Sequence, residues 1–308
     1  MSLLKNKILG TFFGQAIGDA LGLGAEFLSK EEVKAHYPNG LHSYDQIIQD
    51  NFRSRWQKGA WTDDTDQMLC IANAIIKDKD INQLTVAQEL YSWIRNGPAD
   101  IGTSTYQVLS HPQYATDPER AAEWVWDMSY QRSAANGAVM RTSIIGLWDK
   151  ETIKKAEDIC KITHYDPRCV GSCVIVSMLI NRLIHGQSMT ADEMIGLGRK
   201  YDNRIEEYIN LALSEDIESL QLDGTGIGYT LKTLSAGLWV YFHCADFESG
   251  LIAVVNAGGD ADTNGAVACA ILGAKFGYDN IPQYYIDNLV GKEHLYDIAI
   301  QVFDLVNG

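Results

Sequence analysis

Basic residues are scarce in this sequence. The 308 residues include 25 Lys and Arg against 40 Asp and Glu, which gives a formal net charge of -15. Proteins that read nucleic acid through its phosphate backbone depend on a cationic surface, so this class is disfavoured and nucleic acid is not an expected partner. An acidic protein that binds an anionic small molecule needs a local device, such as a metal ion or a helix N-terminus.

Paired cysteines and long apolar runs are also missing. The six cysteines are scattered and none forms a CxxC pair, so we expect buried free thiols in a reducing compartment rather than a disulfide framework. A soft-metal site built from His164, Cys169 and Cys173 is the alternative. The first ten residues lack the apolar core of a signal peptide, and apolar stretches such as residues 171–183 are too short or interrupted to span a membrane. The expected location is therefore the cytoplasm, with no membrane partner.

The apolar pattern predicts helices almost throughout. Apolar residues recur at three- and four-residue steps in segments 8–20, 68–76, 174–183 and 267–272, which is the spacing of one helix face. The six prolines lie mostly in presumed connections. Strict alternation is rare and no fixed-period repeat is present, so a β fold and a helical solenoid are both disfavoured. The sequence predicts a single all-α domain over residues 1–308, with about ten or more helices.

Two of the predicted helices, near residues 10–22 and 265–277, are rich in glycine and alanine. Glycine inside a helix costs about 1 kcal/mol relative to alanine, so something should compensate for it. Close approach of two helices is the favoured compensation, and tight packing without functional meaning is the alternative.

Two acidic clusters stand out, at residues 61–66 (WTDDTD) and 258–264 (GGDADTN), each before a predicted helix. Helix capping by Thr62 or Asp63, and by Asp262 or Thr263, would explain one residue in each cluster. Three carboxylates within four positions exceed that need, and neighbouring like charges repel each other. The excess of carboxylates therefore predicts a bound cation.

The ligand types narrow the choice of cation. Both clusters offer carboxylate and hydroxyl oxygens with no sulfur or imidazole, which suits Mg²⁺ or Mn²⁺, suits Ca²⁺ less well, and argues against Zn²⁺. Oxygens from two segments are enough for two ions about 3.5–4 Å apart, as in two-metal hydrolytic sites. The predicted ligands are Thr62, Asp63, Asp64, Asp260, Asp262 and Thr263.

Six motifs in order along the chain resemble those of the ADP-ribosylglycohydrolase family, which includes dinitrogenase-reductase-activating glycohydrolases and the ADP-ribosyl-arginine and ADP-ribosyl-serine hydrolases. The motifs are Gly14–Gly22 with Glu26-Phe27, Trp61–Thr65, Asp100–Gly102, Asn136–Arg141, His164–Arg168 and Gly258–Thr263. The resemblance implies a compact, orthogonal multi-helix fold with a central binuclear Mg²⁺ or Mn²⁺ site, held by the six ligands named above.

The resemblance also implies roles for further residues. Asp100 matches a carboxylate near the attacking water, and Glu26 an acidic residue on a mobile loop beside the metals. The phosphates would contact Gly102, Thr103 and Ser104, and the remaining implied substrate-binding residues are Asn136, Gly137, Met140, Arg141, His164 and Tyr229. Four alternatives stay open: Asp100 as a helix cap, Glu26 as a solvated carboxylate, Arg141 in a buried structural ion pair, and Tyr229 in packing rather than adenine stacking.

The resemblance implies a metal-dependent hydrolase that cleaves the N- or O-glycosidic bond between ADP-ribose and an acceptor. ADP-ribosylated arginine on a protein is the favoured substrate, because Trp61 before Thr62 resembles arginine-type members. One alternative is another ADP-ribose conjugate, linked through serine, O-acetyl or nucleic acid. The other is a non-catalytic ADP-ribose binder. Nothing in the sequence requires an oligomer, so a monomer is favoured.

Overall fold

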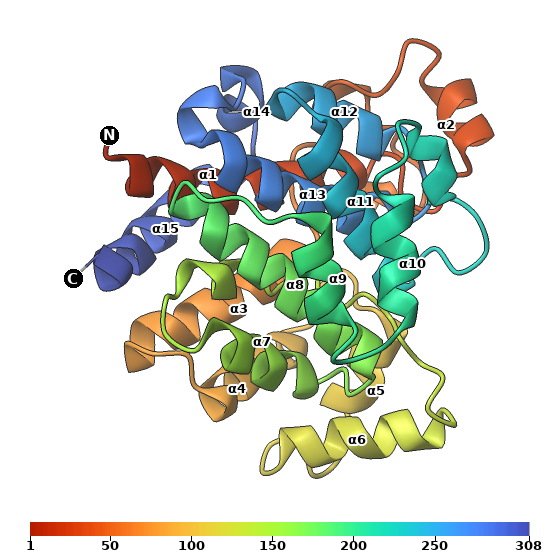
Figure 1. The fold of residues 1–308 in the computed structure, drawn as a ribbon. Coiled ribbons are helices and arrows are strands. Elements are labelled where there is room, and N and C mark those ends of the chain that lie inside the picture. Colours follow the sequence, from red (N-terminus) through yellow and green to blue (C-terminus); the bar gives the residue numbers. More distant parts are fainter. Residues whose placement is uncertain (308) are drawn as a thin grey trace.

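The fold consists of helices and their connections. The computed structural model describes residues 1–307, so Gly308, the last residue of the predicted domain, lies outside the described part. The helices are α1 (Leu3–Gly22), α2 (Lys30–His36), α3 (Asp63–Asp78), α4 (Gln83–Arg95), α5 (Thr103–Leu109), α6 (Pro118–Met128), α7 (Thr152–Lys161), α8 (Pro167–Ile184), α9 (Ala191–Gly198), α10 (Arg204–Leu211), α11 (Thr230–His243), α12 (Phe247–Val255), α13 (Ala261–Phe276), α14 (Gln283–Asp287) and α15 (Lys292–Asn307) (Figure 1). Short 3₁₀ helices span Tyr44–Gln46, Arg53–Arg55, Ser143–Leu147, Ile217–Leu220 and Tyr278–Asn280. These fifteen α-helices, with no strand between residues 1 and 307, confirm the predicted all-α class.

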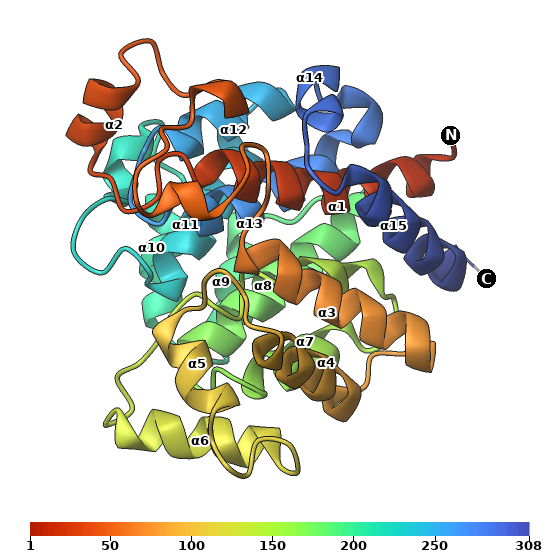
Figure 2. The same ribbon diagram turned by 180° about the vertical axis from the view of Figure 1, so that it is seen from behind.

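The two small-residue helices, α1 and α13, lie side by side near the middle of the molecule in both views (Figures 1 and 2). A Cβ built on Gly18 would lie 2.1 Å from the carbonyl oxygen of Gly265, and one on Gly273 would lie 1.8 Å from that of Gly10. Only glycine permits this backbone-to-backbone contact, which confirms the predicted close approach. The contact continues to the end of α1, where a Cβ on Gly22 would lie 2.3 Å from the carbonyl oxygen of Ala261.

Several helices begin at a residue that caps them. The Ser2 hydroxyl accepts the Lys5 N–H at α1. At α8 the Asp166 carboxylate accepts the Arg168 N–H, and Pro167 occupies the first helical position, where no N–H is needed. The helices that follow the two acidic clusters differ, because neither Thr62 at α3 nor Asp260 at α13 accepts a backbone N–H of its own helix with its side chain. The side chains of Thr62 and Asp260 therefore do not act as helix caps.

Helix α8 corrects one expectation. The apolar stretch at 171–183 was expected to be too short to span a membrane, but the helix that contains it begins at Pro167 and has 18 residues. By length and composition this helix could cross a membrane. In the fold 78% of this helix is buried. It packs against α7, α11 and α13, which is the position of a core helix.

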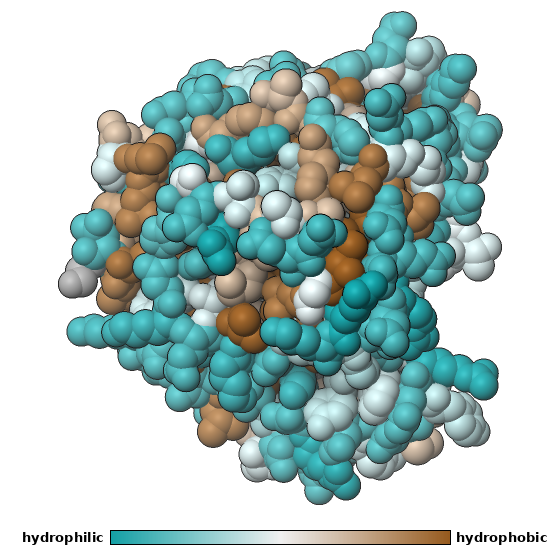
Figure 3. All heavy atoms as spheres, in the orientation of Figure 1, coloured by the Kyte–Doolittle hydropathy of each residue, from teal (hydrophilic) through white to brown (hydrophobic). Residues whose placement is uncertain are grey.

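The remaining core is continuous and the thiols are inside it. One cluster of buried apolar residues reaches from Ile8 to Val302. All six cysteines are buried and free, as predicted. The face shown in Figure 3 is mostly hydrophilic, with hydrophobic side chains in small separate groups. Within the described chain, Glu26, Asp260 and Asp262 have ligand atoms close enough together to share a metal ion. His164, Cys169 and Cys173 do not form such a group, so the alternative soft-metal site is not supported.

Candidate functional site: an acidic cavity between α1, α3 and α13

The start of α3 is capped from another helix. Asp19, on α1, accepts the Thr62 N–H at Oδ1 (2.9 Å) and the Thr65 N–H and hydroxyl at Oδ2 (3.0 and 2.6 Å). This carboxylate is fully buried and satisfies the Thr65 amide, which an N-cap side chain normally serves, together with the amide of Thr62 itself. Asp63 and Asp64 are thereby spared from capping and line a cavity. Asp19 belongs to the Gly14–Gly22 motif, but sequence reasoning assigned it no role.

The start of α13 is shaped by two glycines. Gly258 and Gly259 have φ angles of +72° and +73°, a region that glycine enters without strain. The Gly259 N–H donates to the Leu28 carbonyl (2.8 Å), and the Phe27 N–H donates to the Gly259 carbonyl (2.7 Å). These bonds hold the segment after α1 against the start of α13. They also place Glu26 beside Asp260.

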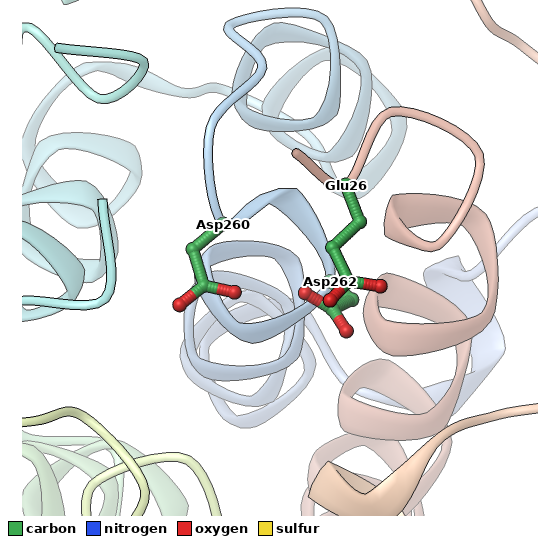
Figure 4. A group of neighbouring side chains, drawn as sticks. All are labelled: Glu26, Asp260 and Asp262. Atoms are coloured by element: carbon green, nitrogen blue, oxygen red, sulfur yellow. The ribbon is translucent and has the colours of Figure 1, made fainter. Parts of the chain in front are cut away.

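Three carboxylates converge at this point (Figure 4). Glu26, from the segment after α1, and Asp260 and Asp262, from the start of α13, each bring one oxygen within 4.8 Å of the others. Glu26 is 4% exposed, so the alternative that it is a solvated loop carboxylate is wrong. An Asn136 amide N–H orients Asp260 by donating to its Oδ2 (2.8 Å).

The first acidic cluster faces the second across the cavity floor. The Thr62 hydroxyl lies 3.4 Å from Asp64 Oδ2 and 3.4 Å from Asp262 Oδ2, although Thr62 and Asp262 are 200 positions apart. Asp63, Asp64, Asp260, Asp262 and Thr263 all line the same cavity. The two clusters thus meet, while Thr62 lies just behind the lining.

The electrostatics of this floor call for a cation. Burial, reinforced by the neighbouring carboxylates, raises the pKa of Asp63 to about 8 and lifts the pKa of Asp64, Asp262 and Glu26 well above the ordinary range. Within the described chain, no Lys, Arg or His forms an ion pair with these groups. Glu26 Oε2 and Asp64 Oδ1 are buried without any hydrogen-bond partner between residues 1 and 307. Buried hard oxygens without a counter-charge can hold a metal ion.

The cavity has a volume of about 480 Å³ and collects most of the predicted site residues. Those that line it are Glu26, Asp63, Asp64, Asp100, Gly102, Thr103, Ser104, Asn136, Gly137, Met140, His164, Asp260, Asp262 and Thr263. Their roles stay predictions, but their convergence into one cavity is observed. Asp100 does not cap a helix, because α5 begins after Gly102; its carboxylate lies 3.7 Å from Arg55 Nη1.

Two predicted substrate-binding residues stand behind the wall. Arg141 is 0% exposed, and its Nη1 donates to the Gln67 side-chain oxygen (3.0 Å) and to the Gly137 carbonyl (2.8 Å). It forms no ion pair with a carboxylate of residues 1–307, so the alternative structural ion pair is also absent. The ring of Tyr229 packs edge-on against Tyr208, and the Arg168 guanidinium lies 5.5 Å from its centre. Tyr229 does not line the cavity, which favours packing over adenine stacking.

An aromatic rim completes the cavity and was missed by sequence reasoning. The rings of Phe27 and Phe52 lie 5.2 Å apart, and both side chains line the cavity. Phe27 is 56% exposed at a φ of +62°, which is uncommon for a bulky residue. The Arg55 guanidinium lies 4.3 Å from the Phe52 ring centre. Phe27 follows Glu26 in a motif and offered a signal, whereas Phe52 lies in a segment without a motif.

Known proteins resemble this chain along nearly its whole length. It is 28% identical to the ADP-ribosylarginine hydrolase Tri1 of Serratia proteamaculans, over 97% of this chain and 79% of that protein. It is also 28% identical to the ADP-ribosyl-(dinitrogen reductase) glycohydrolase of Rhodospirillum rubrum, over 93% of this chain and 91% of that protein. A solved structure described as an ADP-ribosylglycohydrolase-related protein complex superposes with a TM-score of 0.81, at 24% identity, over 99% of this chain and 100% of that one.

The superposition supports the fold, and the sequence profile of the ADP-ribosylglycohydrolase family matches residues 1–308. With the motif residues gathered at one acidic cavity, the family is established over the full sequence. The chain belongs to the ADP-ribosylglycohydrolase family.

Proposed function

We propose that this protein is a divalent-metal-dependent hydrolase that releases ADP-ribose by cleaving the glycosidic bond to its acceptor, with ADP-ribosylated arginine on a protein as the favoured substrate. The observation that carries the proposal is the meeting of two distant carboxylate clusters, buried and without counter-charge, on the floor of one cavity. The names of two relatives, an ADP-ribosylarginine hydrolase and an ADP-ribosyl-(dinitrogen reductase) glycohydrolase, support the reaction class.

Two Mg²⁺ or Mn²⁺ ions are the cofactors that this donor set suits. They would be held by Thr62, Asp63, Asp64, Asp260, Asp262 and Thr263, and the carboxylate of Glu26 stands close enough to Asp260 and Asp262 to join them. When bound, divalent ions would lower the pKa of a coordinated water and would orient the vicinal hydroxyl groups of the sugar. No Cys or His shares this group, which favours Mg²⁺ or Mn²⁺ over Zn²⁺.

The protein's own groups would handle the proton and the acceptor. Asp100 lines the cavity and is partly exposed, so its carboxylate can accept a proton from the attacking water, a role that contributes about 10²–10⁴-fold in rate. Glu26 lines the same cavity, and its predicted role is to supply or organise a proton for a leaving group that needs one. Gly102, Thr103 and Ser104 stay the predicted phosphate contacts, on the wall where α5 begins.

The rim favours a cationic acceptor. Phe27, which follows Glu26 in the sequence, and Phe52 both line the cavity with rings 5.2 Å apart, and Asp100 adds a carboxylate to the same lining. A guanidinium is attracted both to aromatic faces and to carboxylates, whereas a serine hydroxyl gains from neither as strongly. Arg55 already shows such a contact on Phe52. This chemistry supports arginine among the ADP-ribose acceptors.

The test is incubation with arginine-linked and serine-linked ADP-ribosyl peptides, with Mg²⁺ or with a chelator. Release of ADP-ribose should require the metal and should be faster from arginine. D262N should abolish release. The control is D66N. Asp66 lies in the first turn of α3, accepts the indole N–H groups of Trp61 and Trp93 and does not line the cavity, so activity should persist.

Unchanged release in chelator or in D262N would refute the metal-dependent mechanism. Faster release from serine or from O-acetyl-ADP-ribose would change the assigned acceptor. Tight ADP-ribose binding by calorimetry, without turnover of any conjugate, would instead establish the non-catalytic binder.

A further inference from the structure

His164 presents an unpartnered ring nitrogen in the cavity wall. The side chain is 5% exposed and lines the cavity, and its Nε2 has no hydrogen-bond partner between residues 1 and 307. A Cβ built on Gly137 would lie 3.0 Å from His164 Cε1 and 3.2 Å from Nε2, so any other residue at this position would crowd this edge of the ring. Buried polar atoms are normally satisfied, and one that borders a cavity points to a ligand.

The other ring nitrogen is fixed by a hydroxyl. His164 Nδ1 lies 2.8 Å from Thr163 Oγ1, and the same oxygen accepts a hydrogen bond from Arg141 Nη2 (2.5 Å). Arginine can only donate, so the threonine oxygen acts as the acceptor in that bond. The single hydroxyl hydrogen of Thr163 then has one acceptor within reach, the Nδ1 atom of His164.

The alternative arrangement leaves two buried groups without a partner, the Thr163 hydroxyl hydrogen and His164 Nε2, instead of Nε2 alone. If Nδ1 carried the ring proton, it would donate to Thr163, and the hydroxyl hydrogen of this 3% exposed residue would have no acceptor. The ring holds a single proton at neutral pH, because burial and the Arg141 charge lower the pKa of His164 to about 3. The proton consequently resides on Nε2, on the cavity side.

We propose that Thr163 is a positioning residue that, anchored by Arg141, holds His164 as the Nε2–H tautomer and so gives the cavity a fixed neutral donor for an acceptor oxygen of the ligand. The inference rests on the proposed function, in which that oxygen is a ribose or phosphate oxygen of ADP-ribose. Thr163 itself does not line the cavity.

Arg141 is also linked by hydrogen bonds to the acidic floor of the cavity. It donates to the side-chain oxygen of Gln67, whose amide donates to Asp63 Oδ2 (2.9 Å). One buried guanidinium is thus linked, through Gln67, to an acidic side chain of the floor and, through Thr163, to the imidazole of His164. This explains why an arginine stands behind the lining rather than in it.

The tautomer can be measured directly by long-range ¹H–¹⁵N NMR of the imidazole rings in the unliganded protein. The seven histidines are separated by comparison with H164Q, in which the His164 signals disappear. The wild-type protein should show the Nε2–H form alone, T163S should retain it, and T163V should show a mixture. An Nδ1–H ring in the wild type, or an unchanged ring in T163V, would overturn the proposal. The wild-type spectrum decides the matter even if T163V fails to fold.

Calorimetric titration with ADP-ribose tests whether the Nε2–H group of His164 donates a hydrogen bond to the ligand. T163V should bind about tenfold more weakly, the loss of about one hydrogen bond, and T163S within about twofold of wild type. T152V is the matched control, since it also removes a buried threonine hydroxyl bond, from Thr152 to the Trp148 carbonyl, away from the cavity; its affinity should not change. Equal affinity of T163V and wild type would refute the use of this donor. If the wild type did not bind ADP-ribose, the proposed function would fail, while the NMR result would still decide the role of Thr163.

Discussion

Replacing Gly18 by alanine tests the central helix contact. The new Cβ would lie 2.1 Å from the Gly265 carbonyl oxygen and 2.4 Å from its carbonyl carbon, whereas ordinary contacts begin at 3.4 Å. The obstacle is backbone on both sides, so α1 and α13 must separate by about 1 Å or more rather than rotate a side chain. Such overpacking costs about 1–3 kcal/mol and occasionally more, and the backbone contact places Gly18 at the upper end.

A matched glycine gives the opposite expectation. Gly196, within α9, has nothing within 4 Å of its built Cβ. G196A should therefore gain the helix preference of alanine, about 0.5–1 kcal/mol, while G18A should lose about 2 kcal/mol net of that same gain. The two variants make the same chemical change, and their free energies of unfolding should differ by about 3 kcal/mol.

Chemical denaturation, followed by circular dichroism with and without Mg²⁺, measures both variants. G18A should also lower the Mg²⁺ affinity, because α1 leads into Glu26 and α13 begins beside Asp262. A G18A protein as stable as wild type, with unchanged Mg²⁺ affinity, would refute the reasoning that the glycine stripe sets the spacing of the site.

Two further predictions concern the buried carboxylates. D19N leaves one acceptor oxygen where three hydrogen bonds now end, and should lower the free energy of unfolding by about 2–4 kcal/mol in urea titrations; unchanged stability would contradict the cross-helix cap. In chelator, stability should fall as the pH rises from about 4 to about 8, because burial raises the pKa of Asp19 to about 7 and of Asp63 to about 8, so the folded state keeps protons that the unfolded chain has released. With Mg²⁺ the free energy of unfolding should depend less on pH. A metal-free protein that becomes more stable between about pH 4 and about pH 8 would contradict the prediction.

Local patterns predicted the parts of the fold that depend on local chemistry. Three- and four-residue apolar spacing indicated an all-helical chain, and the surplus of carboxylates at residues 61–66 and 258–264 indicated two segments that should meet. Both features are visible because helix amphipathicity and like-charge repulsion act between near neighbours. The glycine content of the two helices likewise predicted their contact, because glycine destabilises a helix interior and a close packing contact can offset that cost.

The features that were not predicted from the sequence depend on tertiary contacts. Asp19 accepts the N–H of Thr62, 43 residues later, just before α3 begins, and no local pattern shows that its carboxylate replaces an N-cap. Arg141 was expected at the ligand because it is charged and lies in a motif, but neutral oxygens behind the wall take four of its hydrogen bonds. Phe52 reaches the cavity through the path of a connecting segment.

The pairing of α1 with α13 also has a consequence for synthesis on the ribosome. The N-terminal helix leaves the exit tunnel about 250 residues before its partner, which is about 12–50 s at about 5–20 residues per second. During that interval the glycine-rich face of α1 has no partner helix, and the two acidic clusters of the cavity floor are not yet together. Nascent chains should therefore complete the acidic floor only near the end of translation, and fragments that stop before α13 should need chaperone protection.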